Sequence, residues 1–360
     1  MDGVFLARPD SIPQDGRRLA VKDLFDTAEL TTTYGSTVFA DHVPERSATA
    51  VTALEAAGYV NVGKTNLHEF AYGVTSQNPH YGTVPNPVEP GRTAGGSSGG
   101  SAAALAAELG DAALGTDSGG SIRIPAACCG VVGFKPTYGL VSLEGVFPLA
   151  PTFDHAGPMA RTVAECARMM EALVPGFELA TETHPRVAVA WLEHCEPSIR
   201  GPVEAAAIGV GAEALEFPFP DNVGPMFMRE VAEVHRDLFA EHRESYGENV
   251  RTKIDRCLAV TDTEHEAARR CREEYRERAE EALAGVDLLL VPTLAFEPPA
   301  ADVDELSVRE AMIRFTFPFN CLGWPALSVP AGGASVQLVG RPGADALVLA
   351  AGASLERGTG

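Results

Sequence analysis

The stretch "TAGGSSGGSAAALAAELGDAALGTDSGGSIRIP" occupies residues 93–125 and contains two clusters of glycine and serine. Such clusters are usual in flexible linkers, but here an alanine-rich apolar run joins them. This run predicts a small-residue helix over 98–109, followed by a buried strand over 112–117. The second cluster follows the strand at once and leaves Ser121 at a strand-to-helix turn. Ser97 in the first cluster and Ser121 in the second are thus either spacer residues or two parts of one reactive site.

Short apolar runs and helical patterns alternate on both sides of this stretch, which is typical of an α/β domain. A helix is expected over 47–58, with Ser47 as its N-cap. Charged helices are expected over 225–245 and 262–284. Further strands are expected at 19–25, 59–66, 131–137, 187–193, 287–293, 325–332 and 336–343, and a last helix at 344–356.

The chain contains no internal repeat and no stretch of linker composition, so a single domain over residues 1–360 is expected. Its core would span about 15–180, a variable helical middle about 181–285, and C-terminal strands and a helix 286–356. This length can bury a large core.

Composition narrows the classes of function. The formal charge of −21 disfavours direct binding of nucleic acid, because phosphates would be repelled. No apolar run is long enough to cross a bilayer, so no membrane partner is expected. Seven cysteines without short paired spacing favour a reducing, cytoplasmic setting. No metal-ligand motif is present, and no metal or cofactor is expected.

The turn after the predicted strand could hold an oxyanion. Ser118, Gly119, Gly120 and Ser121 would direct successive backbone N–H groups into one space. The plainer alternative is a tight turn that ends in a helix-capping serine.

A serine hydroxyl needs a base before it can attack a carbonyl. None of the nine histidines lies in a triad-like pattern. The chain has 24 arginines but only four lysines, Lys22, Lys64, Lys135 and Lys253. A desolvated lysine can lose its proton near neutral pH, whereas arginine cannot. Lys22, near the end of a predicted strand, is the candidate base, and a solvated surface charge is the alternative.

Several motifs together resemble the amidase signature family, in its stand-alone amidase branch. They are "AVKD" (20–23), "VGKTNLHEFAYG" (62–73), "PGRTAGGSSGGSAAALA" (90–106), "ALGTDSGGSIRIPAACCGVVGFKPTYGLVS" (113–142), "GVFPLAPTFDHAGPMARTV" (145–163) and "FNCLGWPALSVPAG" (319–332). The resemblance implies an α/β fold in which helices cover both faces of a central, mixed, twisted sheet. It also implies a Ser–cis-Ser–Lys triad, with Ser121 as nucleophile, Ser97 as the bridging serine after a cis peptide bond, and Lys22 as base.

The same resemblance gives supporting roles to other residues. Asp117 and Arg123 would form a buried polar pair beside the nucleophile. Ser98 would hydrogen-bond within the triad region or cap a helix. By resemblance, the substrate pocket would be lined by Ala71, Tyr72 and Gly73, with core packing an equal alternative for Tyr72. Lys64 would serve the scaffold.

The expected function is hydrolysis of a small carboxylic amide to a carboxylate and ammonia or an amine. One alternative is the glutaminase subunit of a tRNA-dependent amidotransferase, which usually reads "GGSIRQPA" where this chain reads "GGSIRIPA". Another is a non-catalytic binding protein on the same scaffold. The expected partner is a small-molecule amide, and a homodimer is left open. Part of the family's usual connection before a strand is expected to be missing in "AGGASVQLVG".

Overall fold

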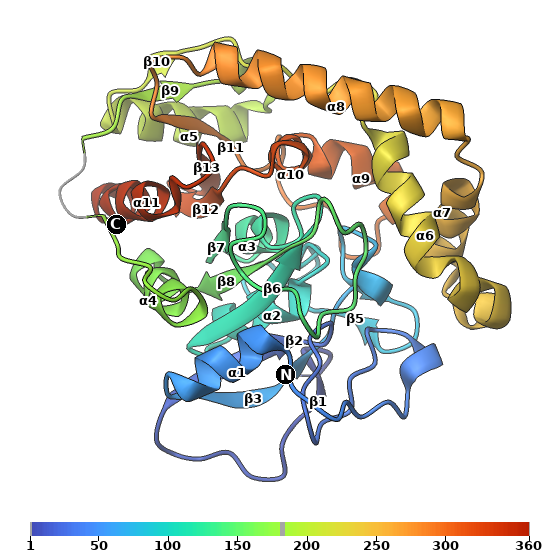
Figure 1. Cartoon of the computed structure of the whole chain (residues 1–360). Coiled ribbons are helices and arrows are strands. Elements are labelled where there is room, and N and C mark those ends of the chain that lie inside the picture. Colours follow the sequence, from blue (N-terminus) through green and yellow to red (C-terminus); the bar gives the residue numbers. More distant parts are fainter. Residues whose placement is uncertain (1, 181–183, 360) are drawn as a thin grey trace.

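The computed structural model describes residues 2–180 and 184–359 of the chain (Figure 1). An 11-stranded sheet runs through the molecule in the order β1-β3-β2-β6-β8-β7-β12-β13-β11-β9-β10. Its strands are β1 (Phe5–Ala7), β2 (Arg17–Lys22), β3 (Tyr59–Thr65), β6 (Ala112–Asp117), β7 (Val132–Lys135), β8 (His155–Ala160), β9 (Val187–Val189), β10 (Glu213–Ala214), β11 (Leu288–Pro292), β12 (Ala326–Ala331) and β13 (Ala334–Gly340). A separate pair is formed by β4 (Gln77–Asn78) and β5 (Gly82–Thr83).

The sheet is mixed, as predicted. Strands β3, β2 and β6 run parallel to one another, and so do β11, β9 and β10. The central strands from β6 to β11 pair in antiparallel fashion, and β1 is antiparallel to β3.

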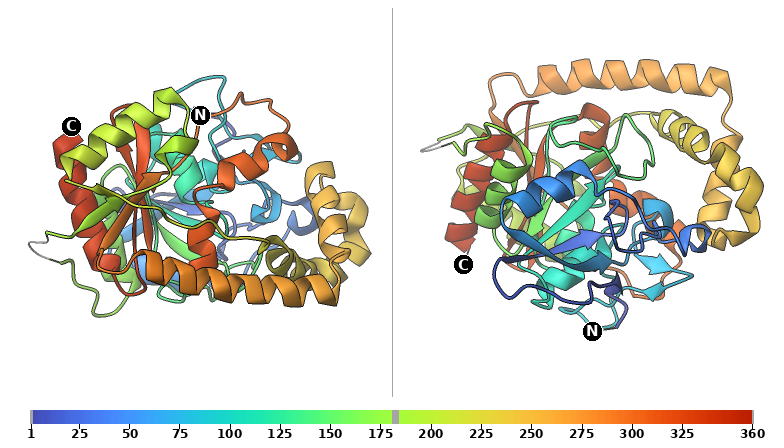
Figure 2. Two further views of the ribbon diagram at one scale, coloured as in Figure 1. Left: turned by 90° about the horizontal axis from the view of Figure 1, so that it is seen from above. Right: turned by 60° about the horizontal axis from the view of Figure 1, so that its bottom comes forward.

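Helices cover both faces of this sheet (Figure 2). One layer holds α1 (Thr49–Ala56), α4 (Val163–Leu173), α11 (Asp345–Thr359) and α5 (Pro197–Gly209), and α2 (Gly99–Ala106) and α3 (Arg123–Cys128) pack on the other face. Successive side chains of β6 point to opposite faces of the sheet and pack against both helix layers. Ala112 and Leu114 belong to one apolar cluster, and Ala113 belongs to another. The predicted fold class is confirmed.

Five further helices lie beyond these layers: α6 (Gly224–His242), α7 (Glu248–Leu258), α8 (Asp262–Ala282), α9 (Glu305–Ile313) and α10 (Phe317–Leu322). The long helix α8 lies along the upper edge of the molecule in Figure 1 and packs on α6 and α10. Short 3-10 turns occur at Thr37–Phe39, Glu69–Ala71, Leu192–His194 and Arg243–Ser245.

Helix α2 lies unusually close to the chain before it. A Cβ atom added to Gly100 would lie 2.2 Å from the carbonyl oxygen of Asn66, so a larger residue would push the helix away. The glycine and alanine content that resembled a linker thus lets α2 pack tightly. This packing fixes the position of Ser97, two residues before the helix.

Some expected boundaries were wrong. Ser47 does not cap α1, which begins at Thr49 without a side-chain cap; the Ser47 hydroxyl accepts a hydrogen bond from the Ala28 N–H instead, at 3.0 Å. The short connection before β13 is closed by a two-residue turn, Gly332–Gly333, and both glycines have positive φ. Two-residue hairpin turns of this kind suit glycine, so the hairpin is complete without a longer loop.

Candidate active site

The site forms where two neighbouring parallel strands end. Strands β2 and β6 pair in parallel with Val21 opposite Leu114, so Lys22 and Thr116 emerge at the same edge of the sheet. Carboxyl ends of parallel strands are where side chains can converge outside the sheet. This register explains how residues that are 94 positions apart meet.

Lys22 is joined to Ser97 across this edge. Its Nζ lies 2.8 Å from Ser97 Oγ and donates to Thr116 Oγ1 at 2.6 Å. The peptide bond between Gly96 and Ser97 is cis. Both Lys22 and Ser97 are fully buried.

Burial also sets the protonation of this lysine. Loss of solvent lowers the pKa of Lys22 to about 7, although the charges of Asp117 and Asp154 act in the opposite direction. A large fraction of the side chain is therefore uncharged near neutral pH, as a base must be.

The segment that carries Ser97 is tied to the second serine cluster. The carbonyl oxygen of Ser97 accepts from the His68 N–H at 3.2 Å and from the Ser76 hydroxyl at 3.2 Å. The Ser98 N–H donates to the carbonyl oxygen of Ser121 at 3.1 Å. The Ser98 hydroxyl bonds the backbone of Thr116 and does not cap α2. Ser98 thus links Ser97, Ser121 and the end of β6.

Ser121 differs from the other two triad candidates in its exposure. It is 8% exposed, whereas Lys22 and Ser97 are at 0%. Within residues 2–180 and 184–359, its hydroxyl has no hydrogen-bond partner. Of the three candidate residues, Ser121 is therefore the one with solvent-exposed surface.

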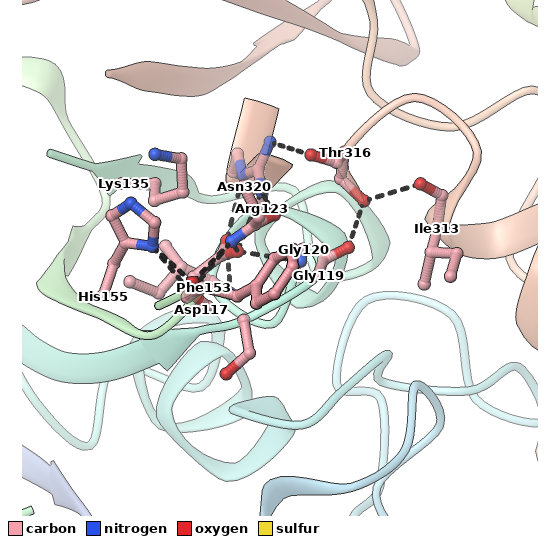
Figure 3. A network of polar contacts seen from close by, with 12 residues as sticks. Asp117, Gly119, Gly120, Arg123, Lys135, Phe153, His155, Ile313, Thr316 and Asn320 are labelled. Carbon is pink, nitrogen blue, oxygen red and sulfur yellow. Dashed lines mark hydrogen bonds and ion pairs between the residues drawn. The ribbon is translucent and has the colours of Figure 1, made fainter. Parts of the chain in front are cut away.

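A buried ion pair holds the turn that carries Ser121 (Figure 3). Arg123 donates to both carboxylate oxygens of Asp117, at 2.9 and 2.8 Å. Its remaining N–H groups reach Thr316 O, Gln337 Oε1 and Asn320 Oδ1. Burial alone would raise the pKa of Asp117, but the charge and hydrogen bonds of Arg123 outweigh it and hold the pKa well below its usual range.

This ion pair uses one of the expected oxyanion donors. The Gly120 N–H donates to Asp117 Oδ1 at 2.8 Å, so it does not point into the open side of the turn. In the part of the chain that the structure describes, the N–H groups of Ser118, Gly119 and Ser121 have no protein acceptor. Gly120 serves instead through its φ of +132°, which shapes the turn.

Ser118 is fixed from the opposite side. Its hydroxyl donates to Asp154 Oδ1 at 2.5 Å, and Asp154 also accepts from the N–H groups of Leu149 and Ala150. Burial raises the pKa of Asp154, against these hydrogen bonds. Thr116, Ser118 and Asp154 line a cavity of about 140 Å³ with apolar neighbours that include Phe147.

The segment 71–73 lies on another side of the site. Tyr72 lines a second cavity, of about 370 Å³, together with Phe317. Ala71 is buried with a φ of +58°. Gly73 packs against the imidazole of His68, 2.3 Å from where its Cβ would be. Of the three, only Tyr72 is placed on this cavity.

All four lysines of the chain are buried, at 0–3% exposure. Lys64 forms an ion pair with Asp23 at 3.1 Å and donates to Phe25 O and Thr32 Oγ1. It supports the loop directly after Lys22. Burial, followed by the charge of Arg123, lowers the pKa of Lys135 well below its ordinary value. Lys253 pairs with Glu305 at 3.1 Å.

Five site residues were missed by the sequence interpretation: Thr116, Asp154, Thr316, Asn320 and Gln337. Thr116 left a usable signal, because it is a polar residue at the buried end of a strand beside the serine motif. Across residues 2–180 and 184–359, no group of three or more His, Cys, Asp or Glu could hold a metal ion. No described helix is both long and apolar enough to cross a membrane.

Comparison with known proteins gives the family of this chain. The family model named Amidase matches residues 12–233 and 212–349. A crystal structure of an amidase is 40% identical, with a TM-score of 0.86 over 96% of this chain and 85% of that one. A glutamyl-tRNA(Gln) amidotransferase subunit from Synechococcus sp. (strain RCC307) is 34% identical over 92% of this chain and 80% of its own.

A structure from work on the evolutionary origins of an s-triazine catabolic enzyme is 31% identical, with a TM-score of 0.87 over 96% of this chain and 84% of that one. The chain belongs to the amidase signature family. It is a hydrolase of that family, whose members act on carbon–nitrogen bonds.

Proposed function

We propose that this protein hydrolyses small carboxylic amides through an acyl-enzyme on Ser121. The observation that carries the proposal is the buried Lys22 with a lowered pKa, hydrogen-bonded at 2.8 Å to Ser97. The next residue, Ser98, donates its N–H to the carbonyl oxygen of Ser121, which is 8% exposed. A buried amine, a bridging hydroxyl and an accessible hydroxyl are the parts that serine acylation needs.

In the first half-reaction, neutral Lys22 takes the hydroxyl proton of Ser97, and Ser97 takes the proton of Ser121. The Ser121 oxygen forms a bond to the amide carbonyl carbon, and the oxyanion is held by the free N–H groups of Ser118, Gly119 and Ser121. The C–N bond then breaks, and the proton on Lys22 returns through Ser97 to the departing nitrogen. The products of this half-reaction are ammonia or an amine and an ester of Ser121.

In the second half-reaction, water attacks the ester carbonyl and gives its proton to the same relay. The Ser121 oxygen leaves and takes that proton back from the relay, and the carboxylic acid departs and loses its own proton to solvent. Esters and carbamates can enter by the same route, because their carbonyl carbons accept the same attack.

The test is a panel of primary amides hydrolysed by the wild type and by Ser121→Ala. We expect loss of at least about 10³-fold in kcat/KM for the variant, because no other group forms the acyl bond. Ser198→Ala, an exposed serine on α5, is the matched control and should keep wild-type turnover. Labelling by a fluorophosphonate should occur at Ser121 and nowhere else. Wild-type rates in Ser121→Ala would refute the proposal.

A second candidate is the glutaminase subunit of a tRNA-dependent amidotransferase. It is favoured by the 34% identity to the Synechococcus amidotransferase subunit. Ile124 supports the first candidate, since the usual glutamine is replaced by a buried side chain in an apolar cluster with Val74 and Met312. Glutamine hydrolysis that appears only with partner subunits would favour the second candidate.

A further inference from the structure

The cavity beside Tyr72 carries an unusual charge for this chain. Three cationic side chains, Lys253, Arg256 and Arg309, line it against one acidic side chain, Glu310. The rest of the wall includes aromatic rings such as Phe227 and Phe317. In a protein with a formal charge of −21, this gathering of cationic side chains differs from the composition of the chain as a whole.

Part of this positive charge is already compensated. Lys253 donates to Tyr72 O and pairs with Glu305 at 3.1 Å. Burial lowers the pKa of Lys253, whereas for Glu305 the nearby cations outweigh burial and hold its pKa at about 2. Glu305 is thus ionised, and it lies within 4 Å of both Lys253 and Arg309. Among the described residues, Arg256 is the one cation of this cavity that forms no ion pair.

The two guanidinium groups have unused donors. Arg256 is exposed on α7, and within residues 2–180 and 184–359 its guanidinium has no hydrogen bond or ion pair. Arg309 reaches Glu305 only at 3.6 Å and otherwise lies over the Tyr72 ring, 5.0 Å from its centre. A guanidinium presents several N–H donors in a planar fork that matches a carboxylate.

The cavity borders the turn that carries the nucleophile. Ile313 and Phe317 line it, and between them the Thr316 hydroxyl donates to Gly119 O at 2.6 Å (Figure 3). A Cβ atom on Gly119 would lie 3.6 Å from the Phe317 ring. One side chain therefore separates the cavity from the proposed oxyanion donors.

The opposite side of the turn belongs to the base. Thr116, the partner of Lys22, lines the smaller cavity together with Ser118. In the proposed mechanism the leaving nitrogen receives its proton from the Lys22 side, so it faces the smaller cavity. The acyl part of the substrate then extends toward the cationic cavity.

We propose that the cavity lined by Lys253, Arg256 and Arg309 binds an anionic group, a carboxylate, at the far end of the acyl part of the substrate. The preferred substrates are then half-amides of dicarboxylic acids, with an apolar linker along Phe227 and Phe317. This assignment rests on the proposed amidase function and names its substrate class.

The kinetic test compares pairs of primary amides that differ only in a terminal methyl or a terminal carboxylate. We expect kcat/KM to favour the carboxylate member by about tenfold or more, since charge-assisted hydrogen bonds discriminate at this level. Arg256→Gln and Arg309→Gln should each reduce that ratio by about tenfold. Arg236→Gln, an exposed arginine on the neighbouring helix α6, should leave the ratio unchanged. Equal rates within each pair, or a ratio that the pocket variants do not alter, overturn the assignment.

A binding test separates this inference from the catalytic one. Calorimetry on Ser121→Ala with hexanoate should show binding that weakens in the double variant with Arg256→Gln, whereas hexanol should bind more weakly and without that dependence. Hexanoate that binds no better than hexanol overturns the anion site, even if the wild type cleaves amides. Selective hexanoate binding by a wild type that cleaves no amide leaves the site standing and removes the catalytic proposal.

Discussion

A single side chain, Lys22, sets the protonation state of the site. It has no carboxylate partner at hydrogen-bond distance among the described residues, only the hydroxyls of Ser97 and Thr116. Two alcohols can hold an uncharged amine at little cost, whereas they stabilise an ammonium less well than water does. The environment thus favours the basic form that the proposed mechanism needs.

The pH dependence of kcat/KM follows from this environment. Below about pH 7 Lys22 becomes protonated and cannot accept a proton, so the rate should fall about tenfold for each pH unit below that value. Above it the rate should level off. Initial rates on a neutral amide between about pH 5 and about pH 9 measure both the fall in kcat/KM at low pH and the plateau above it.

Lys22→Met should abolish turnover at every pH. The explanation fails if the wild-type profile is flat through neutrality, or if its limb appears near the ordinary pKa of lysine.

Some residues of the candidate site could be predicted from the sequence, and others could not. Composition drew attention to the four lysines, and the resemblance to the amidase signature family gave Lys22, Ser97 and Ser121 their expected roles. Thr316 and Asn320 could not be found in this way. Both lie about 200 residues from the turn that they hold, and their neighbourhood has no pattern of its own. Only the packing of α10 beside that turn gives them their role.

At the scale of elements, the turn between β6 and α3 is the most constrained. Gly120 has a φ of +132°, and a Cβ atom there would lie 2.2 Å from the Thr316 hydroxyl. The same turn carries the Asp117–Arg123 pair. Backbone conformation, close packing and charge therefore all act on the same short segment.

Gly120→Ala should destabilise the fold by about 3 kcal/mol, from backbone strain together with overpacking against Thr316. Thermal or denaturant unfolding measures the change. Gly209→Ala, at the exposed last residue of α5 with open space around the added methyl, is the control and should change the stability by no more than about 0.5 kcal/mol. A Gly120→Ala protein as stable as the wild type would contradict this explanation, because it would mean that the added methyl group meets neither strain nor Thr316.

Elements with strong periodicity were predicted well, and short ones were not. The strand at 112–117 matches β6, and the two charged helices match α6 and α8 within a few residues. Strand β8 was missed because "HAGPMA" has small residues and a proline, which are poor strand formers outside this pairing. Helix α10 is six residues long and begins beside Pro318, too short for a helical period to show.

At the scale of the whole molecule, charge is the dominant feature. A formal charge of −21 on 360 residues creates self-repulsion that the compact state must bear. The ion pairs at the surface relieve it only locally, since exposed pairs contribute little. Composition predicted this acidity but not the gathering of Lys253, Arg256 and Arg309 around the cavity between α7 and α9.

Added salt should therefore stabilise the protein. Screening of the like charges should raise the Tm as NaCl increases from about 0.02 M to about 0.5 M. A differential scanning series gives the trend, and sucrose at matched osmolality controls for general cosolute effects. A Tm that falls over this range would mean that attractive pairs outweigh the repulsion.

The burial of all four lysines has a practical consequence for handling the protein. Reagents that acylate or cross-link primary amines have no lysine to modify on the folded surface, so coupling to a solid support through lysine should fail unless the fold opens. The extent of lysine acylation with time then reports opening of the native state, residue by residue, by peptide mass spectrometry. Lys22 modified as slowly as Lys64 would mean that both become accessible only when the sheet itself comes apart.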